Sequence, residues 1–591
     1  MNINSENTEN KTMPQSPKVY DFTIIGAGVA GLAVAALLAK DGFKVKLIES
    51  HSKPGGCASF FRNAGFRYDV GATTLSGLEE GQPIAELIQE LGLDKVVYRN
   101  KIGTEDKETS LRLSHSERGT QIFQDGKIIH RYTDKEKWID ESYEKLISNK
   151  NIDTEKNHQA FWNELYRIEK SAFKILKTHK NLLPNSFQDY LSCLAPSKLL
   201  ASLSGLTHLP QLYLPLKYLL KKYFLSDEKD FIKFLDEQLI ISTQNNTEKT
   251  PIFTAALGLT YSSSVYYVYG GVNQLAVALQ KRAEELGVEI IMRREVTEIN
   301  PSPNQSLLLI SKDDDSKQNE KYEQKKQPSK IYLIKDKTGE EHLSKGIISN
   351  LTFWSMAKLT EGETQNFFQG FVNKFNYDIS AFTIYLGLNT NYVPPTDYAQ
   401  INLNKPIQHC CSNSFYISYS RPDDHIKASE GGLNIIISTH TQAQEWLNLS
   451  EEEYLKKKAE TESYILEELF NTIPELVKEG GNAESGTLQR STELAKNESK
   501  ISLDEVRHKI KSLISGTAKT FLHYTKRKNG VVGGLPHSTD YSFFELMPKK
   551  VPNENIYMVG DTGFPGQGLV STVYSALSVR ESLRNKNPLM P

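Results

Sequence analysis

Three glycines between two apolar segments near the amino end constrain this chain more than any other feature. Residues 21–25 (Asp-Phe-Thr-Ile-Ile) lead into Gly26-Ala-Gly28-Val-Ala-Gly31, and a run of helical character follows. Gly26 permits a tight turn, Gly28 lets the backbone approach a pyrophosphate, and Gly31 lets helix and strand pack closely. The N–H groups and positive dipole at the helix start favour a diphosphate. The pattern therefore predicts a strand–turn–helix unit that binds a dinucleotide.

A second apolar segment, residues 44–49 (Lys-Val-Lys-Leu-Ile-Glu), completes the pattern. It ends in Glu49, which lies 18 residues after Gly31. A carboxylate at the end of this strand can accept hydrogen bonds from both ribose hydroxyls of an adenosine. Three glycines alone are weak evidence, but strand, glycines, helix, strand and acid in this order are specific. We expect an α/β protein with a Rossmann-like nucleotide-binding domain.

The charge and the cysteine content argue against nucleic-acid binding, a zinc site and a redox dithiol. The 591 residues include 70 basic and 72 acidic side chains, so no net field attracts nucleic acid. The four cysteines form no CxxC pair and have no ligand-like spacing to histidine, which argues against a zinc site or a redox dithiol. So few cysteines in so long a chain indicate a reducing compartment, and we expect a cytoplasmic protein.

Three segments are too polar to bury a core. Residues 1–19 read as a disordered leader without the apolar stretch of a signal peptide. Residues 311–330 and 480–500 are nearly all polar or charged, and they read as surface insertions because they offer little apolar surface to offset ordering entropy.

Two later stretches look like further parts of the nucleotide-binding domain. Gly270-Gly271 opens a predicted helix to Glu285, and strand-like runs follow at 288–299, 331–334 and 346–351. This order could complete the sheet begun at residue 21. Residues 555–561 form a short apolar strand ending in Gly560-Asp561, before a glycine-rich turn and a predicted helix over 569–583. Paired with the amino-terminal glycines, this second turn favours a flavin dinucleotide, with Asp561 accepting from ribityl hydroxyls.

The segment between about 101 and 265 is predicted to be mostly helical. Residues 199–216 contain no Lys, Arg, Asp or Glu, but prolines and polar groups interrupt them, so a spanning helix is disfavoured. A buried helix pair is one interpretation. The other is a surface that dips into a membrane, flanked by Lys217, Lys221 and Lys222.

These patterns predict a discontinuous domain organisation. The cofactor-binding domain consists of residues 20–100, 266–352 and 551–585, and the substrate domain of 101–265 and 353–550.

Several motifs resemble the carotenoid desaturase and isomerase family of FAD oxidoreductases. They are ESHSKPGGCAS at 49–59, GFRYDVGATTLSG at 65–77 and VGDTGFPGQGLVSTVYSAL at 559–577. The GATTLSGLEEG run from 71 and FLHYTKRKNGVVGG at 521–534 are similar to the branch of carotenoid isomerases and desaturases of acyclic carotenoid end groups, which is related to retinol saturases. The resemblance implies a glutathione-reductase-type FAD domain with an inserted helical and sheet substrate domain.

Position by position, the resemblance implies a set of FAD-binding residues. The diphosphate would lie on the glycine loop, the ribose on the acid, the adenine on the strand after residue 288, and the isoalloxazine on the carboxy-terminal turn. The implied residues are Gly26, Gly28, Ala30, Gly31, Glu49, Gly55, Gly56, Arg62, Val296, Gly560, Asp561, Gly566, Gly568 and Leu569.

The resemblance also implies the chemistry. A flavin would accept a hydride from an allylic carbon of a lipophilic polyene in an apolar tunnel. Desaturation is our first hypothesis; isomerisation by reduced flavin, saturation, amine oxidation and lipid binding without turnover remain alternatives. No second nucleotide fingerprint is present, which favours oxygen or a membrane quinone as electron acceptor, the latter on the inner face of the cytoplasmic membrane. Neither His523 nor His537 stands out as catalytic, and we assign no catalytic or metal-binding residue.

The roles of several other residues stay open. Tyr261 and its neighbours to Tyr269 could line the tunnel, but ordinary core or sheet packing is the preferred interpretation. Lys526 and Arg527 could position the flavin or a polar end group, or simply be exposed basic residues.

Overall fold

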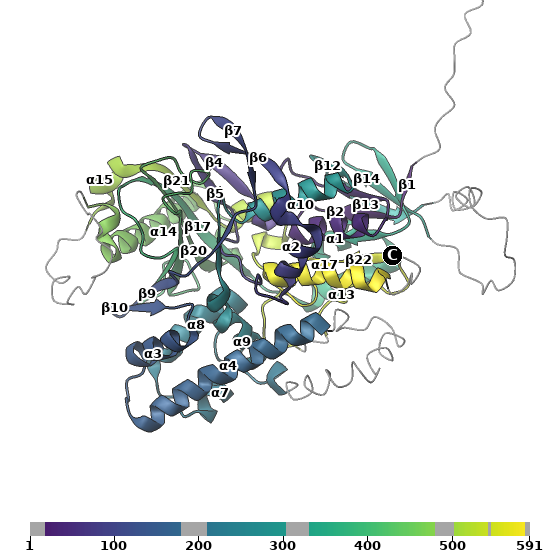
Figure 1. Ribbon diagram of the computed structural model, residues 1–591. Helices are drawn as coiled ribbons and strands as arrows, with labels where there is room; N and C mark the ends of the chain where they lie inside the picture. The colour runs from purple at the N-terminus through teal and green to yellow at the C-terminus, as the bar shows by residue number, and fades with distance from the viewer. Residues whose placement is uncertain (1–17, 179–209, 303–329, 479–500, 542–544, 585–591) are drawn as a thin grey trace, which may run out of the picture.

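A computed structural model of the chain describes residues 18–178, 210–302, 330–478, 501–541 and 545–584 (Figure 1). The predicted leader lies outside these ranges up to residue 17, as do most of the 311–330 insertion and the whole of the 480–500 insertion. Much of the 199–216 segment is outside them too. In the described residues, no helix has both the length and the apolar character that crossing a bilayer requires.

A five-stranded parallel sheet assembles the nucleotide-binding domain from three distant parts of the chain. Its order is β12-β3-β2-β16-β22. The strands are β2 (Phe22–Ile25), β3 (Val45–Ile48), β12 (Glu289–Ile291), β16 (Ile347–Ser349) and β22 (Ile556–Met558). They are buried because helices pack on them, as is usual for parallel sheets. Strands from all three segments predicted for the nucleotide-binding domain therefore join one sheet.

The strand after residue 331 differs from the prediction. It does not extend the parallel sheet but belongs to a separate four-stranded sheet of order β1-β15-β14-β13. These strands are β1 (Val19–Tyr20), β13 (Val296–Pro301), β14 (Tyr332–Asp336) and β15 (Glu341–Ser344). An antiparallel hairpin joins β14 to β15, and such a hairpin cannot continue a parallel sheet. The strand-like run at 288–299 is likewise divided, since β12 and β13 lie in different sheets.

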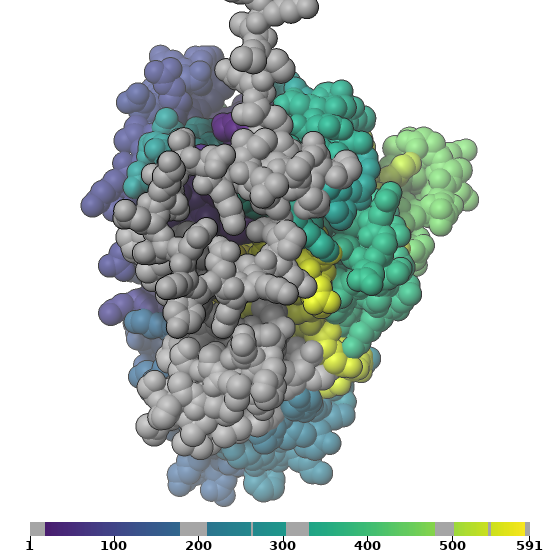
Figure 2. Space-filling model, turned by 90° about the vertical axis from the view of Figure 1, so that its right-hand side faces the viewer, coloured from purple at the N-terminus to yellow at the C-terminus, as the bar shows by residue number. Residues whose placement is uncertain are grey.

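Helices pack together beside the parallel sheet. Helix α1 (Val29–Lys40) packs between α10 (Asn273–Glu285) and α17 (Leu569–Arg584), and α2 (Pro83–Leu91) lies against α17. In Figure 1 this domain lies on the right, with α17 in yellow beside the purple α1. In Figure 2 yellow residues near the carboxy end lie between the blue helical unit below and teal segments on the right.

The inserted part consists of a seven-stranded sheet and a helical unit. The sheet order is β10-β9-β18-β19-β20-β17-β21. The strands are β9 (Thr120–Gln124), β10 (Lys127–Arg131), β17 (Ile379–Asn389), β18 (Tyr398–Asn402), β19 (Ser414–Tyr419), β20 (Gly432–Gln442) and β21 (Ile510–Gly516). The helices are α3 (Lys135–Leu146), α4 (Ile152–Thr178), α7 (Lys217–Lys222), α8 (Lys229–Thr243) and α9 (Ile252–Thr260), around a core rich in Trp, Phe and Leu.

The expectation of a mostly helical segment from 101 is wrong for its first thirty residues. Residues there form hairpins and short strands instead: β6 (Val97–Ile102) with β7 (Glu105–Ser110), β8 (Leu113–His115), which pairs with β11 (Tyr266–Val268), and then β9 with β10. Strand β8 pairs with the remote β11, and β9 pairs with the remote β18 as well as with the adjacent β10, so the strand character of this segment depends partly on tertiary contacts.

The remaining elements connect these parts. They are hairpin β4 (Phe60–Asn63) with β5 (Phe66–Asp69), and helices α12 (Phe353–Leu359), α13 (Gly362–Lys374), α14 (Glu451–Thr472), α15 (Leu503–Val506) and α16 (Ala518–Thr525).

Candidate active site

A single large cavity extends from the parallel sheet to the inserted domain. Its volume is 1790 Å³, well above the ~300–1,000 Å³ of most small-molecule sites. At one end its wall is the glycine loop after β2 and the end of β3. At the other it is the seven-stranded sheet and the helices α4 and α9. One continuous space therefore offers room for a dinucleotide and a long second molecule.

The glycine loop is shaped so that only glycine fits. Gly26 has φ +98°, a conformation that other residues rarely adopt. A Cβ on Gly31 would lie 2.1 Å from the Gly26 carbonyl oxygen, so α1 can approach β2 only with glycine at this position. Gly28 and Ala30 line the cavity at the first turn of α1, whose N-cap has no side-chain hydrogen bond. These are the features of an anion site at a helix start.

Glu49 lines the cavity directly after β3. Its carboxylate accepts hydrogen bonds from the backbone N–H of Ala27 at 2.6 Å and of His51 at 2.7 Å. The two bonds fix the side chain next to the glycine loop, and a carboxylate has lone pairs left for hydroxyl donors. The acid and the glycines are thus held together as the fingerprint predicts.

Two asparagines that no sequence motif marks support the same loops. Asn350, directly after β16, lines the cavity, and a Cβ on Gly28 would lie 2.2 Å from its Nδ2 atom. Asn273, the first residue of α10, donates from Nδ2 to the carbonyls of Pro54 and Ala58 at 2.8 and 3.1 Å. It thereby holds the loop of Gly55 and Gly56, which have φ +112° and +56°.

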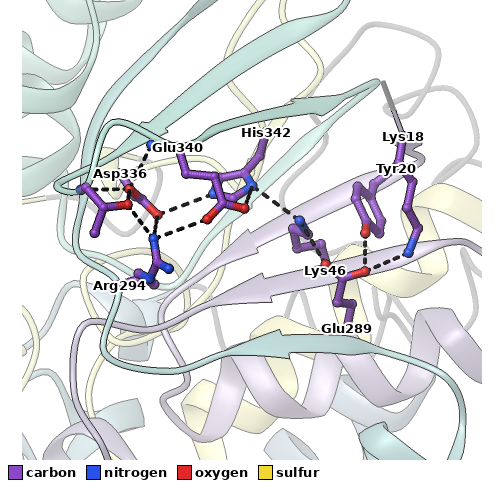
Figure 3. Close-up of polar contacts among 9 residues, drawn as sticks. Lys18, Tyr20, Lys46, Glu289, Arg294, Asp336, Glu340 and His342 are labelled. Atoms are coloured by element: carbon purple, nitrogen blue, oxygen red, sulfur yellow. Dashed lines mark hydrogen bonds and ion pairs between the residues drawn. The ribbon is translucent and has the colours of Figure 1, made fainter. Parts of the chain in front are cut away.

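Charged side chains around β13 brace the end of the cavity beside Glu49 (Figure 3). Val296 lines the cavity, and the Arg294 N–H donates to the Glu49 carbonyl at 2.7 Å. The Arg294 guanidinium pairs with Asp336 at 3.0 Å and with Glu340 at 3.2 Å. Burial alone would raise the pKa of Asp336, but hydrogen bonds from Thr338, Glu340 and Arg294 lower it to about 2.

Asp336 and Glu340 also have, with His342, the spacing of a metal site. The guanidinium already supplies the positive charge between the two carboxylates, and burial lowers the pKa of His342, with Lys46 acting in the same direction. The positive charge of Arg294 therefore compensates the two carboxylates without a metal ion. Farther along, Figure 3 shows Lys18, Tyr20 and Lys46 converging on Glu289.

Asp561 lines the cavity after β22 and pairs with Arg527. The guanidinium donates to both carboxylate oxygens, at 2.8 and 2.7 Å, and also to the Gly533 carbonyl. Burial by itself would lower the pKa of Arg527, but Asp561 raises it, so the guanidinium stays charged. Arg527 was one of two basic residues whose role the sequence left open; the structure places it at the cofactor end of the cavity.

The structure separates the other predicted residues into two groups. Gly560, Gly568 and Leu569 line the cavity, as do Gly55 and Gly56. Gly31, Gly566 and Arg62 are not among its lining residues. Gly31 acts through packing, and a Cβ on Gly566 would lie 3.0 Å from the His537 ring. Arg62 in β4 donates instead to the carbonyl of Lys101 at 2.6 Å, away from the glycine loop.

The far wall of the cavity is mainly apolar and contains a few polar side chains. On β17 and β20 the paired residues Thr383 and Ser438, and Ala381 and His440, face it. Burial lowers the pKa of both His440 and the cavity-lining His537 to about 4, so both rings are neutral at neutral pH. Apolar residues from the helical unit complete the wall; they are Ala172, Phe173, Ile175, Leu176, Leu212, Ile241, Phe253 and Leu257.

Of the tyrosines between 261 and 269, only Tyr261 is among the residues that line the cavity. Tyr261 lines the cavity, but Tyr267 and Tyr269 donate instead to Asp424 and Asp423, at 2.8 and 2.9 Å. His523 does not line it. Ordinary packing therefore accounts for Tyr267 and Tyr269.

Comparison with known proteins shows which folds this arrangement resembles. Residues 24–91 match the model of an NAD(P)-binding Rossmann-like domain. A solved oxidoreductase from Methanosarcina mazei covers 95% of this chain and 99% of its own with a TM-score of 0.52 and 15% identity. A putrescine oxidase mutant covers 97% and 100%, with a TM-score of 0.53 and 12% identity. These likenesses show the fold, an α/β architecture built on a Rossmann-like nucleotide-binding domain.

The chain is also similar in sequence to enzymes of known reaction. The chain is 23% identical over 602 residues to the chloroplastic prolycopene isomerase of Daucus carota, covering 97% of this chain and 82% of that protein. It is 27% identical over 296 residues to the 4,4'-diapolycopene oxygenase of a Methylomonas species, covering 47% and 49%. The chain is thus similar, over nearly its whole length, to enzymes named for carotenoid substrates.

Proposed function

We propose that this protein is an FAD-dependent oxidoreductase acting on a carotenoid or a similar lipophilic polyene, with desaturation as its reaction. One observation carries the proposal: a single cavity joins the dinucleotide loops to an apolar wall built by the inserted domain. A hydrocarbon chain offers no charge to bind, and an apolar tunnel suits it. Relatives named for carotenoid substrates support this substrate class.

The residues present fit FAD. The Gly26, Gly28 and Ala30 loop would hold the diphosphate, Glu49 the ribose, Val296 the adenine and Asp561 the ribityl chain. When bound, the flavin supplies a hydride acceptor. The protein's own contribution is to orient the polyene against it and to exclude water, and His440 and His537, both neutral, add no charge to that wall.

Geometric isomerisation is the second candidate. The relatives that match over nearly the whole chain are named prolycopene isomerases, and such a reaction leaves the mass of the polyene unchanged. No second nucleotide fingerprint is evident in the sequence, so oxygen or a membrane quinone is the proposed acceptor for desaturation.

Membrane contact is part of the proposal. Tyr213, Leu214, Tyr218 and Phe224 around α7 are exposed, and Phe224 is 81% exposed. Leu212, next to them in sequence, lines the cavity, and Lys221 lies in the same helix. An apolar patch with basic residues suits the surface of an anionic bilayer, from which a polyene could enter.

The test uses bacterial cells that accumulate acyclic carotenoids. The protein is expressed, and the mass and absorption spectrum of the extracted pigment are recorded. Loss of a hydrogen pair with a red shift is expected. Unchanged mass with altered retention would identify an isomerase, and gain of a hydrogen pair a saturase. Unaltered pigment, with flavin bound to the purified protein, would refute acyclic carotenoids as substrates.

A further inference from the structure

One acidic residue interrupts the apolar face that α4 presents to the cavity. The face consists of Glu169, Ala172, Phe173 and Leu176, spaced i, i+3, i+4 and i+7. This spacing places all four side chains on one side of a helix. Three of them suit a hydrocarbon, whereas the carboxyl group of Glu169 does not.

Within the residues that the structure describes, the Glu169 carboxyl has neither a hydrogen bond nor an ion pair. Burial raises its pKa to about 7, and the nearby Glu79 adds to the rise. Glu79 itself accepts from the Tyr266 hydroxyl at 3.0 Å. On the same helix Glu164 is paired, with Lys222 at 2.5 Å and with the Tyr223 hydroxyl. A partly buried carboxyl without a partner disfavours folding, so its place in a cavity wall indicates a ligand group that satisfies it.

Resting on the proposed function, we propose that Glu169 is a specificity-determining residue that binds the hydroxyl group of a polyene alcohol. A hydroxyl can donate to the ionised carboxylate and accept from the protonated carboxyl, so it is a partner for both forms of this group. An ammonium group would match only the ionised form, and a hydrocarbon end would match neither. The apolar residues one and two turns along α4 would then contact the polyene chain.

The experiment compares two ligands with the same chromophore. FAD-loaded protein is titrated with all-trans-retinol and with its deoxy hydrocarbon analogue, and the dissociation constants are measured by fluorescence. Retinol should bind at least ~10-fold more tightly, because a site arranged to bond a hydroxyl discriminates against ligands that lack it. The preference should persist in Glu169→Gln, disappear in Glu169→Leu, and be unchanged in Glu155→Leu, the same substitution at an exposed position of α4.

Three results would overturn the inference. They are equal binding of the alcohol and the hydrocarbon by the unsubstituted protein, a preference that survives Glu169→Leu, and tighter binding of retinylamine than of retinol. The first comparison needs no variant, so misfolding of a variant leaves it intact. Equal binding of both ligands refutes only the role of Glu169. Binding of neither ligand, with flavin present, also refutes this inference, whereas the pigment assay in carotenoid-accumulating cells tests the proposed function separately.

Discussion

A buried ion pair joins helix α17 to the end of helix α1. The cost of breaking this pair can be predicted as a free energy. Arg580 in α17 donates two hydrogen bonds of 2.7 Å to Asp41, the C-cap of α1, and both side chains are less than a tenth exposed. Removing one partner of such a pair costs about 3–5 kcal/mol, since the other charge stays buried. Arg584 lies 3.2 Å from Asp41 and compensates in part, so we expect about 3 kcal/mol for Arg580→Met.

Amide hydrogen exchange measures this loss where it occurs. Local opening of α17 should become roughly 150-fold more frequent in Arg580→Met, because 1.36 kcal/mol is a factor of ten. Arg584→Met is the matched control; its side chain is 39% exposed, so a change below about 1 kcal/mol is expected. The double variant Asp41→Leu with Arg580→Met should recover much of the loss. Exchange in Arg580→Met within about fivefold of the unsubstituted protein would refute the reasoning.

Three further outcomes are expected. Gly31→Ala should purify with at least ~10-fold less flavin absorbance, because its Cβ would meet the Gly26 carbonyl, whereas Gly370→Ala in α13, where a Cβ has open space, should keep its flavin. Glu90→Gln should lower stability by about 1–2 kcal/mol at neutral pH. Burial would raise the pKa of Glu90, but Arg580 and Lys40 lower it to about 2. The difference in melting temperature between the unsubstituted protein and Glu90→Gln should therefore shrink as the pH falls from about 4.5 towards 2. A difference that stays constant over this range would contradict the prediction. Phe224→Glu should reduce flotation with anionic liposomes but leave flavin content unchanged; undiminished flotation would argue against the α7 patch.

The sequence predicted the nucleotide-binding domain well because its signals are local. Strands β2, β3, β16 and β22 are short, almost wholly apolar runs, and the backbone conformation at Gly26 needs glycine whatever surrounds it. The hairpins between 97 and 131 were missed. Strand β7 reads Glu-Asp-Lys-Glu-Thr-Ser and is largely exposed, so it shows no apolar alternation.

The candidate site was predictable only where a motif marks it. Asn273 and Asn350 act on loops more than 200 residues away in the sequence, and no periodicity reports such a contact. Glu169 stands at helical spacing with apolar residues, but only the fold shows that this face meets a cavity rather than solvent.

The segments that form the nucleotide-binding sheet are far apart along the chain, and this affects when the sheet can form during synthesis of the protein. Its outermost strand β22 and the helix α17 come from the last described stretch of the chain, yet they pack against β16 and α1. Chains emerge from the ribosome amino end first. The glycine loop is therefore made early but cannot be enclosed until residue 584 has been translated. Chains that stop before residue 584 should be unable to retain the flavin, so that cofactor loading reports that translation has passed this residue.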